Sequence, residues 1–251
     1  MGKRHEAIGI KQVIHFEWVK KTANLLLSGV DTKTIRQELH DFIADKKGNG
    51  SSGKRSDQTR TFVVNNLMKI WVTPDSDLIP FRDAALGFLR QNPSMALAVH
   101  WAVISAVYPF WFNVAKQIGR LLGLQEEVTQ KQIINRMKEQ YGDRETVSRY
   151  SRYVIRSFIN WGVLEDAKSG GVYRYGHHTN IGDNTELIGL IIEGLLHQHA
   201  EGRMHVDALL RSPGLFPFSL PHCSIENVIS KNDRVEIEKT GFELLMIHLV
   251  K

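Results

Sequence analysis

The sequence predicts a mainly α protein with an N-terminal helical bundle, a central winged helix-turn-helix module and a C-terminal α+β extension. Residues 1–124 carry apolar side chains at helical spacing and no convincing alternating strand. Residues 125–176 show the order helix, turn, helix, hairpin. Residues 177–251 combine an apolar helix with a second hairpin pattern, which is also compatible with a second, degenerate winged helix.

Length and composition limit the class of protein. The 251 residues suit one large or two small domains, and 42% apolar with 24% charged residues is ordinary for a globular chain. The formal net charge of +5 favours an anionic partner. The single Cys223 cannot form an internal disulfide, and the N-terminus lacks an apolar signal core. These features predict a cytoplasmic protein.

Start and stop signals divide the first 124 residues into helices. One helix is expected to end at Ser28-Gly29, and Asp31 or Thr32 can cap the next. Another is expected over about 59–72, and Pro80 opens the one after it.

An apolar segment raises the question of a membrane span. There is no charged residue between Arg90 and Lys116, and a spanning helix needs about 20 such residues. Pro109 would break that helix in the middle. Two buried helices, over about 94–108 and 110–123, therefore fit better, and we expect no contact with a membrane.

Residues 125–176 contain the predicted winged helix-turn-helix. Glycine and aspartate at 142–143 make a tight turn between two helices, and Thr146 is a plausible cap for the second helix. A glycine-rich turn at 168–171 separates two short strands. The expected helices and strands cover residues 130–141, 146–161, 163–165 and 172–175.

The helix over 146–161 has an apolar side and a basic side. Arg149, Arg152 and Arg156 fall opposite its apolar stripe. A guanidinium group donates two hydrogen bonds at once to phosphate oxygens or guanine edges. Nine basic and five acidic residues in 131–175 give this segment +4 of the chain's +5. A solvated surface helix is the ordinary alternative.

Six cations are the predicted DNA contacts. The three arginines of the helix would enter or straddle a groove, and a cation near the helix start would meet phosphate. Two further cations would hold the wing on the DNA backbone. The six residues are Arg144, Arg149, Arg152, Arg156, Lys168 and Arg174.

A glycine-rich loop partly matches a phosphate-binding motif. Residues 48–54 fit G-x-x-x-x-G-K, but Arg55 stands where Mg²⁺ coordination needs Ser or Thr. The loop also follows a helical pattern, whereas the motif follows a strand. We interpret residues 46–55 as a mobile basic loop, with DNA contacts left open.

No catalytic or metal-binding motif is present with the residue spacing that its chemistry requires. There is no G-x-S-x-G, no H-E-x-x-H and no dinucleotide fingerprint. The C-terminal third is rich in metal-ligand residue types, but without chelating spacing: His177, His178, His197, His199, His205, His222 and Cys223. The sequence thus predicts a protein that is not an enzyme, with no catalytic residue, metal, cofactor or small-molecule substrate.

The order of several segments resembles the BrxA-like proteins of BREX phage-exclusion systems. The segments are residues 25–31, the apolar block around His100, residues 128–152, Phe158 and residues 161–165. The resemblance covers residues 20–175. It implies a small, non-catalytic, largely helical protein that binds DNA beside larger phage-defence subunits.

These inferences predict a non-catalytic protein that binds double-stranded DNA and serves as an accessory component of a bacterial phage-defence system. The alternative is a protein-interaction scaffold whose winged helix is structural, favoured by the high apolar content of residues 94–124. A nuclease or nucleotide-dependent enzyme is a third class, which lacks a carboxylate or metal signature here.

Overall fold

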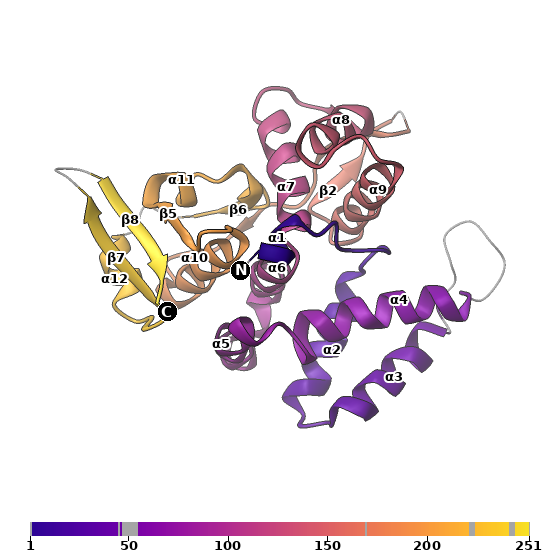
Figure 1. The fold of residues 1–251 in the computed structure, drawn as a ribbon, viewed down its shortest axis with the longest axis horizontal. Helices are drawn as coiled ribbons and strands as arrows, with labels where there is room; N and C mark the ends of the chain where they lie inside the picture. Colours follow the sequence, from indigo (N-terminus) through magenta and orange to yellow (C-terminus); the bar gives the residue numbers. More distant parts are fainter. Residues whose placement is uncertain are drawn as a thin grey trace.

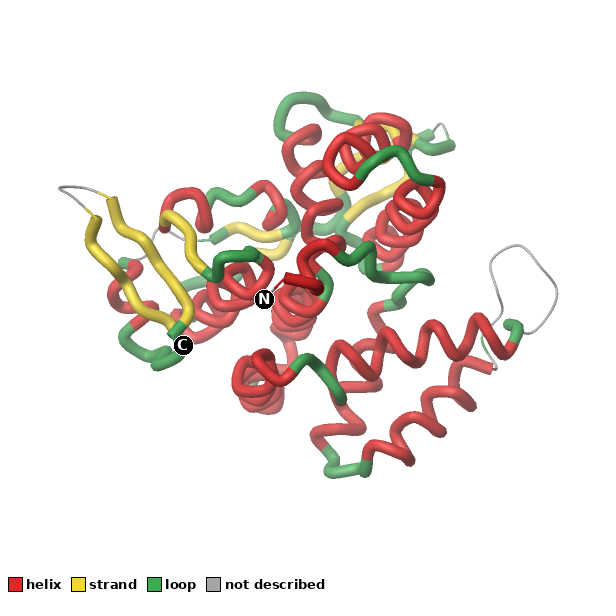
Figure 2. The backbone as a smooth tube through the Cα atoms, in the orientation of Figure 1, coloured by secondary structure: helices red, strands yellow, loops and turns green. Residues whose placement is uncertain are grey.

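A computed structural model describes residues 2–44, 46, 55–168, 170–220, 224–240 and 244–250. Among them the chain is mainly helical, with three small sheets (Figures 1 and 2). In Figure 1 the pair α3 (Thr32–Ala44) and α4 (Asp57–Leu67) lies at one end of the molecule, and the hairpin β7 (Val235–Thr240) with β8 (Leu244–Leu249) lies at the other.

The N-terminal helices begin and end near the predicted signals. Gly29 follows α2 with a φ of +73°, and the Asp31 carboxylate accepts hydrogen bonds from the first backbone amides of α3. The expected helix over 59–72 is α4 followed by a π-helical turn. The motif at 48–54 lies outside the described residues. The helices are α1 (Gly2–Glu6), α2 (Phe16–Leu27), α3 (Thr32–Ala44), α4 (Asp57–Leu67) and α5 (Ile79–Gln91), with short turns Met68–Val72 and Ser76–Leu78.

The apolar segment forms two helices that meet at Pro109, as predicted. They are α6 (Ala96–Val107), preceded by a short turn at Pro93–Met95, and α7 (Pro109–Leu122). No single helix among the described residues is long and apolar enough to cross a membrane. The two helices pass that test only as a pair bent by 117°. Nearly every side chain of α6 is buried, because α2, α5, α7 and α10 pack around it.

Residues 109–175, which we call the central region, form a helix, a strand, two helices and a hairpin. The expected helices and hairpin are present, and Val128–Thr129 adds a short strand that was not predicted. The sheet order is β1-β3-β2, so the strand before the helix pair joins the hairpin. The elements after α7 are β1 (Val128–Thr129), α8 (Gln130–Tyr141), α9 (Glu145–Asn160), β2 (Leu164–Asp166) and β3 (Val172–Tyr175).

Residues 185–249, which we call the C-terminal region, have the same order of elements except for one additional strand, β6 (Phe218–Ser219), between the two helices of the pair. Their sheet order is β5-β8-β7, so again the strand before the helix pair joins the final hairpin. The predicted second hairpin is confirmed. A parallel pair, β4 (Thr179–Asn180) with β6 (Phe218–Ser219), adds a two-stranded sheet. The other elements are α10 (Thr185–Gln198), β5 (Arg203–His205), α11 (Val206–Leu210), a turn at Pro213–Leu215, α12 (Ile225–Ile229), β7 (Val235–Thr240) and β8 (Leu244–Leu249).

A cluster of aromatic rings joins the regions. Trp101 of α6 lies 5.8 Å from Trp111 of α7 and 5.0 Å from Phe158 of α9, centroid to centroid. Phe216, from the C-terminal third, packs edge-on against Trp101 at 5.8 Å. Such edge-to-face pairs add to the burial of the rings, so this cluster fixes α9 relative to both halves of the chain.

Candidate nucleic-acid interface

Local sequence signals fix where the helix pair of the central region begins and where the chain turns between its two helices. The Thr129 side chain accepts a hydrogen bond from the Gln132 amide, and the Gln132 side chain accepts one from the Thr129 amide. This capping box fixes where α8 begins. Gly142, with a φ of +87°, makes the turn into α9, a conformation that favours glycine.

The second helix, α9, presents its arginines on the predicted side. Val147, Val154 and Phe158 are fully buried, whereas Arg149 and Arg156 are exposed and Arg152 is half-exposed. The predicted cap at Thr146 is wrong. The helix begins at Glu145, its N-cap position is Arg144, and no side chain caps it. Here the tight turn, not a hydroxyl cap, sets where the helix starts.

The inner side of α9 is held by the N-terminal segment. The Ile14 amide donates to Ser157 Oγ at 2.9 Å, and the Phe16 amide donates to Asn160 Oδ1 at 2.9 Å. The indole of Trp161 donates to the Ile14 carbonyl oxygen at 2.9 Å. These bonds immobilise the C-terminal half of α9, so its outer side is presented from a rigid support.

The hairpin lies beside the outer side of α9. Glu165 pairs with Arg174 across β2 and β3, and the Ala167 amide donates to the Val172 carbonyl oxygen at 2.8 Å. Arg156 reaches from α9 to Asp166 at the end of β2, with an N–O distance of 3.1 Å. The hairpin and the exposed side of the helix therefore form one continuous surface.

The hairpin is also fixed to the start of α8. The Gln130 amide donates to the Gly171 carbonyl oxygen, and the Tyr173 hydroxyl donates to Gln130 Oε1 at 3.0 Å. Burial raises the pKa of Tyr173, with Asp166 acting in the same direction and Arg156 against it. The phenol thus stays a neutral donor, and the hairpin cannot rotate freely about its base.

Three of the six predicted contact residues are in exposed ion pairs. The N–O distances are 2.9 Å for Arg152–Glu145, 3.1 Å for Arg156–Asp166 and 3.2 Å for Arg174–Glu165. Exposed pairs of this kind contribute little to stability, about 0–1 kcal/mol. Each arginine can therefore exchange its carboxylate for another anion at low cost.

The other three predicted residues have no ion pair among the described residues. Arg144 donates a hydrogen bond to the Tyr141 carbonyl oxygen, Arg149 lies 5.5 Å from the Tyr150 ring centroid, and Lys168 is exposed in the hairpin turn. Lys131, on the first turn of α8, shares this property. Lys131 contributes to the basic charge of residues 131–175 but is not among the six contacts predicted from the sequence. Its place at the start of a helix next to the hairpin was the available signal.

The histidine-rich C-terminal third does not extend this surface. His177 and His178 are exposed after β3, whereas His197 is buried in α10. His222 and Cys223 lie outside the described residues.

Comparisons with known proteins add no relative. No family model, no curated protein and no solved structure matches the chain. The resemblance of residues 20–175 to BrxA-like proteins stays a prediction.

Proposed function

We propose that the central region is a winged helix-turn-helix that binds double-stranded DNA without catalysis. The observation that carries the proposal is the exposed basic side of α9, placed between a tight turn and a two-stranded wing with the sheet order β1-β3-β2. In helix-turn-helix proteins the second helix enters the major groove. Here α9 is that second helix, and Arg149, Arg152 and Arg156 are the residues it would bring to the groove.

The distribution of charge supports this role. Every acidic side chain of residues 128–175 pairs with a cation, and the cations left without an ion pair in the described part of the chain are Lys131, Arg144, Arg149 and Lys168. Phosphate contacts of such cations supply affinity that does not depend on base sequence. The expected binding is therefore strongly salt-dependent.

The scaffold alternative loses the feature that favoured it. Residues of α6 and α7 are almost completely buried inside the chain. Four large apolar side chains are exposed in the described part: Ile79, Leu124, Tyr175 and Val250. Leu124 and Tyr175 line one shallow pocket, in which Gln125, Glu126 and Arg174 are their polar neighbours. A few exposed apolar residues of this kind are ordinary on a monomeric protein and need no partner to cover them.

The experiment is binding of a fluorescent random-sequence duplex at several salt concentrations. The wild-type affinity should fall steeply with salt. The double variant Arg149→Gln, Lys168→Gln should bind more weakly, and its log–log salt slope should be flatter by about 1.8, two contacts at about 0.9 each. The corresponding Arg152→Ala, Arg156→Ala variant should flatten the slope by about the same amount.

A matched control removes one arginine and one lysine elsewhere. Arg90 and Lys33 are exposed and have no ion pair among the described residues. The variant Arg90→Gln, Lys33→Gln should keep the wild-type slope. Equal weakening in both double variants would mean that net charge, not the α9 surface, controls binding. Absence of wild-type binding at low salt would overturn the proposal.

A role in phage defence rests only on the resemblance to BrxA-like proteins. We include it in the proposal as the setting in which DNA binding would be used, beside other phage-defence subunits. Its test is protection of cells against phage infection with and without the Arg149→Gln, Lys168→Gln substitutions. Undiminished protection by a variant that no longer binds DNA would separate the two claims.

A further inference from the structure

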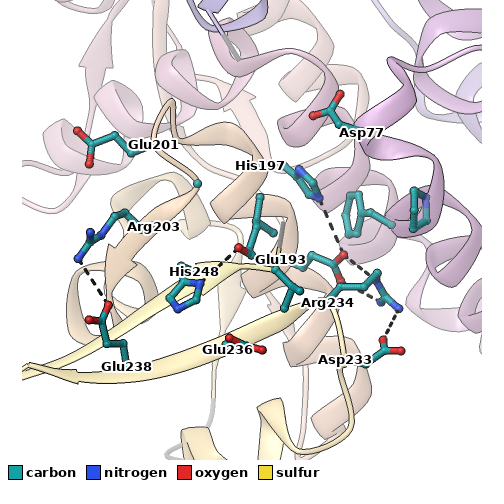
Figure 3. Close-up of a pocket in the computed structure, with 15 residues that line it drawn as sticks. Asp77, Glu193, His197, Glu201, Arg203, Asp233, Arg234, Glu236, Glu238 and His248 are labelled. Atoms are coloured by element: carbon teal, nitrogen blue, oxygen red, sulfur yellow. Dashed lines mark hydrogen bonds and ion pairs between the residues drawn. The ribbon is translucent and has the colours of Figure 1, made fainter.

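A large pocket lies far from the α9 surface, between the start of α5, the C-terminal half of α10 and the β5-β8-β7 sheet. Its volume is about 860 Å³, within the usual range for sites that hold small organic molecules. Pro80, Phe81, Leu249 and Val250 supply apolar wall. Charged side chains supply most of the rest, together with His197, His248 and Gly202 (Figure 3). The pocket has no part in the proposed DNA contacts.

The charge of the pocket is opposite to that of the chain. Two guanidinium groups line it, those of Arg203 and Arg234, against six carboxylates. Glu201 and Glu236 are exposed and form no ion pair among the described residues. The six carboxylates are Asp77, Glu193, Glu201, Asp233, Glu236 and Glu238.

One end of the pocket is rigid. Glu193 is 1% exposed and accepts hydrogen bonds from Arg234 Nε at 2.8 Å, Arg234 Nη2 at 3.0 Å and Asn232 at 2.9 Å. Figure 3 shows this carboxylate between Arg234 and His197. These bonds hold the Glu193 carboxylate and the Arg234 guanidinium group in fixed positions at the wall, and Arg234 neutralises the charge of Glu193.

His197 is the unsatisfied group at this end. Its side chain is 8% exposed and lines the pocket, and its Nδ1 atom has no hydrogen-bond partner among the described residues. Burial lowers the pKa of His197 to about 4, with Arg4 acting in the same direction, so the imidazole is neutral and keeps one nitrogen as an acceptor. Phe81 lies beside it, 5.4 Å between centroids, and is itself part of the apolar lining of the pocket.

We infer that this pocket binds an aliphatic polyamine, with ammonium groups against Glu201, Glu236 and the His197 end, and methylene groups along the apolar wall. A single metal ion does not suit the site, because among the described residues no three His, Cys, Asp or Glu side chains converge on one point. An anion would face the excess of carboxylates. A polyamine carries both kinds of group that this lining can contact, ammonium groups for the carboxylates and methylene groups for the apolar side chains.

The test is calorimetric titration of the full-length chain, without DNA, with butylamine, putrescine and spermidine. Affinity should rise along this series as the number of ammonium groups rises. In the variant Glu201→Gln, Glu236→Gln, spermidine should bind about tenfold more weakly, the loss expected for two solvent-exposed charge pairs. Because both side chains are exposed, we expect this variant to fold normally.

A matched control separates a site from general attraction of cations. Glu126 and Glu127 are exposed, lie outside the pocket and form no ion pair in the described part of the chain. The variant Glu126→Gln, Glu127→Gln should bind spermidine like the wild type. Equal weakening in both variants, complete displacement of spermidine by Mg²⁺ at the same ionic strength, or no saturable binding would each overturn the inference. None of these results bears on DNA binding.

Discussion

Apart from the additional strand β6 in the C-terminal region, the central and C-terminal regions have the same order of elements, and their charge is opposite. Residues 109–175 contain eleven basic and seven acidic residues, whereas residues 185–249 contain five basic and nine acidic. The second helix of the pair has 16 residues in α9 and five in α12. A shared topology therefore does not bring a shared function, because function depends on the side chains placed on it. The ligands that we propose differ accordingly: DNA for the central region and an organic cation for the C-terminal region.

The largest expected effect is on stability, and it concerns the arginine–carboxylate ion pairs of the two regions. Arg234 neutralises the buried Glu193, whereas Arg156 and Asp166 form an exposed pair. Arg234→Ala leaves a buried carboxylate without its cation and should reduce the free energy of unfolding by about 3 kcal/mol or more.

Urea denaturation measures this loss. Adding Glu193→Gln to Arg234→Ala should restore part of the stability, since the buried charge is then gone. If Arg234→Ala changes stability no more than Arg156→Ala does, the distinction between a buried and an exposed pair is wrong.

The next effect concerns α6, the helix against which both α7 and α10 pack. Burial, with a smaller contribution from Lys20, lowers the pKa of His100 from 6.5 to about 3, and neither ring nitrogen has a hydrogen-bond partner among the described residues. The unfolded chain therefore takes up this proton below pH 6.5 while the folded chain does not. Stability falls as the pH drops from about 6.5 toward 3, by about 1.4 kcal/mol per pH unit.

The variant His100→Leu removes this contribution to the pH dependence of stability. Between pH 7 and pH 5 its free energy of unfolding should fall by about 2 kcal/mol less than that of the wild type. His177→Asn, at an exposed position, is the control and should follow the wild type. An unchanged pH dependence in His100→Leu would contradict the assignment of a neutral buried imidazole.

A smaller effect, on duplex affinity, is expected when the carboxylate beside Arg156 is removed, and it can be compared with the same change beside Arg234. Asp166→Asn frees Arg156 from its carboxylate and should strengthen duplex binding about two- to fivefold, with less than about 1 kcal/mol change in stability. Asp233→Asn, which removes an exposed carboxylate 3.3 Å from Arg234 in the C-terminal region, should leave the affinity unchanged. Fluorescence anisotropy with the same duplex measures both. Equal gains in duplex affinity for the two variants would show that binding depends only on the net charge of the protein.

Much of the central region could be predicted from local sequence signals. The helix expected over 130–141 has those bounds because Thr129 caps it and Gly142 ends it. The strand at Val128–Thr129 was missed, because two residues carry no periodicity and their pairing with β3 is distant in sequence. The sequence placed Arg152 and Arg156 on one side of a helix but could not show that each has a carboxylate partner.

The pocket could not be predicted for a similar reason. Asp77, Glu193 and Glu236 come from three separate segments, and only the packing of α5, α10 and the C-terminal sheet brings them together. In the sequence, His197 is one of several histidines without chelating spacing, and nothing distinguishes it from the others. The feature that sets it apart is its burial beside Glu193, with an N–O distance of 3.9 Å.

The most direct test of the comparison is charge reversal in each region. Arg149→Glu with Lys168→Glu alters α9 and its wing, and Lys231→Glu with Lys239→Glu alters the corresponding part of the C-terminal region by the same net charge. The measurement is the affinity for a random duplex at fixed salt. We expect the first variant to bind more than about tenfold more weakly and the second to bind like the wild type. Equal losses, or a larger loss in the second variant, would contradict the assignment of DNA to the central region.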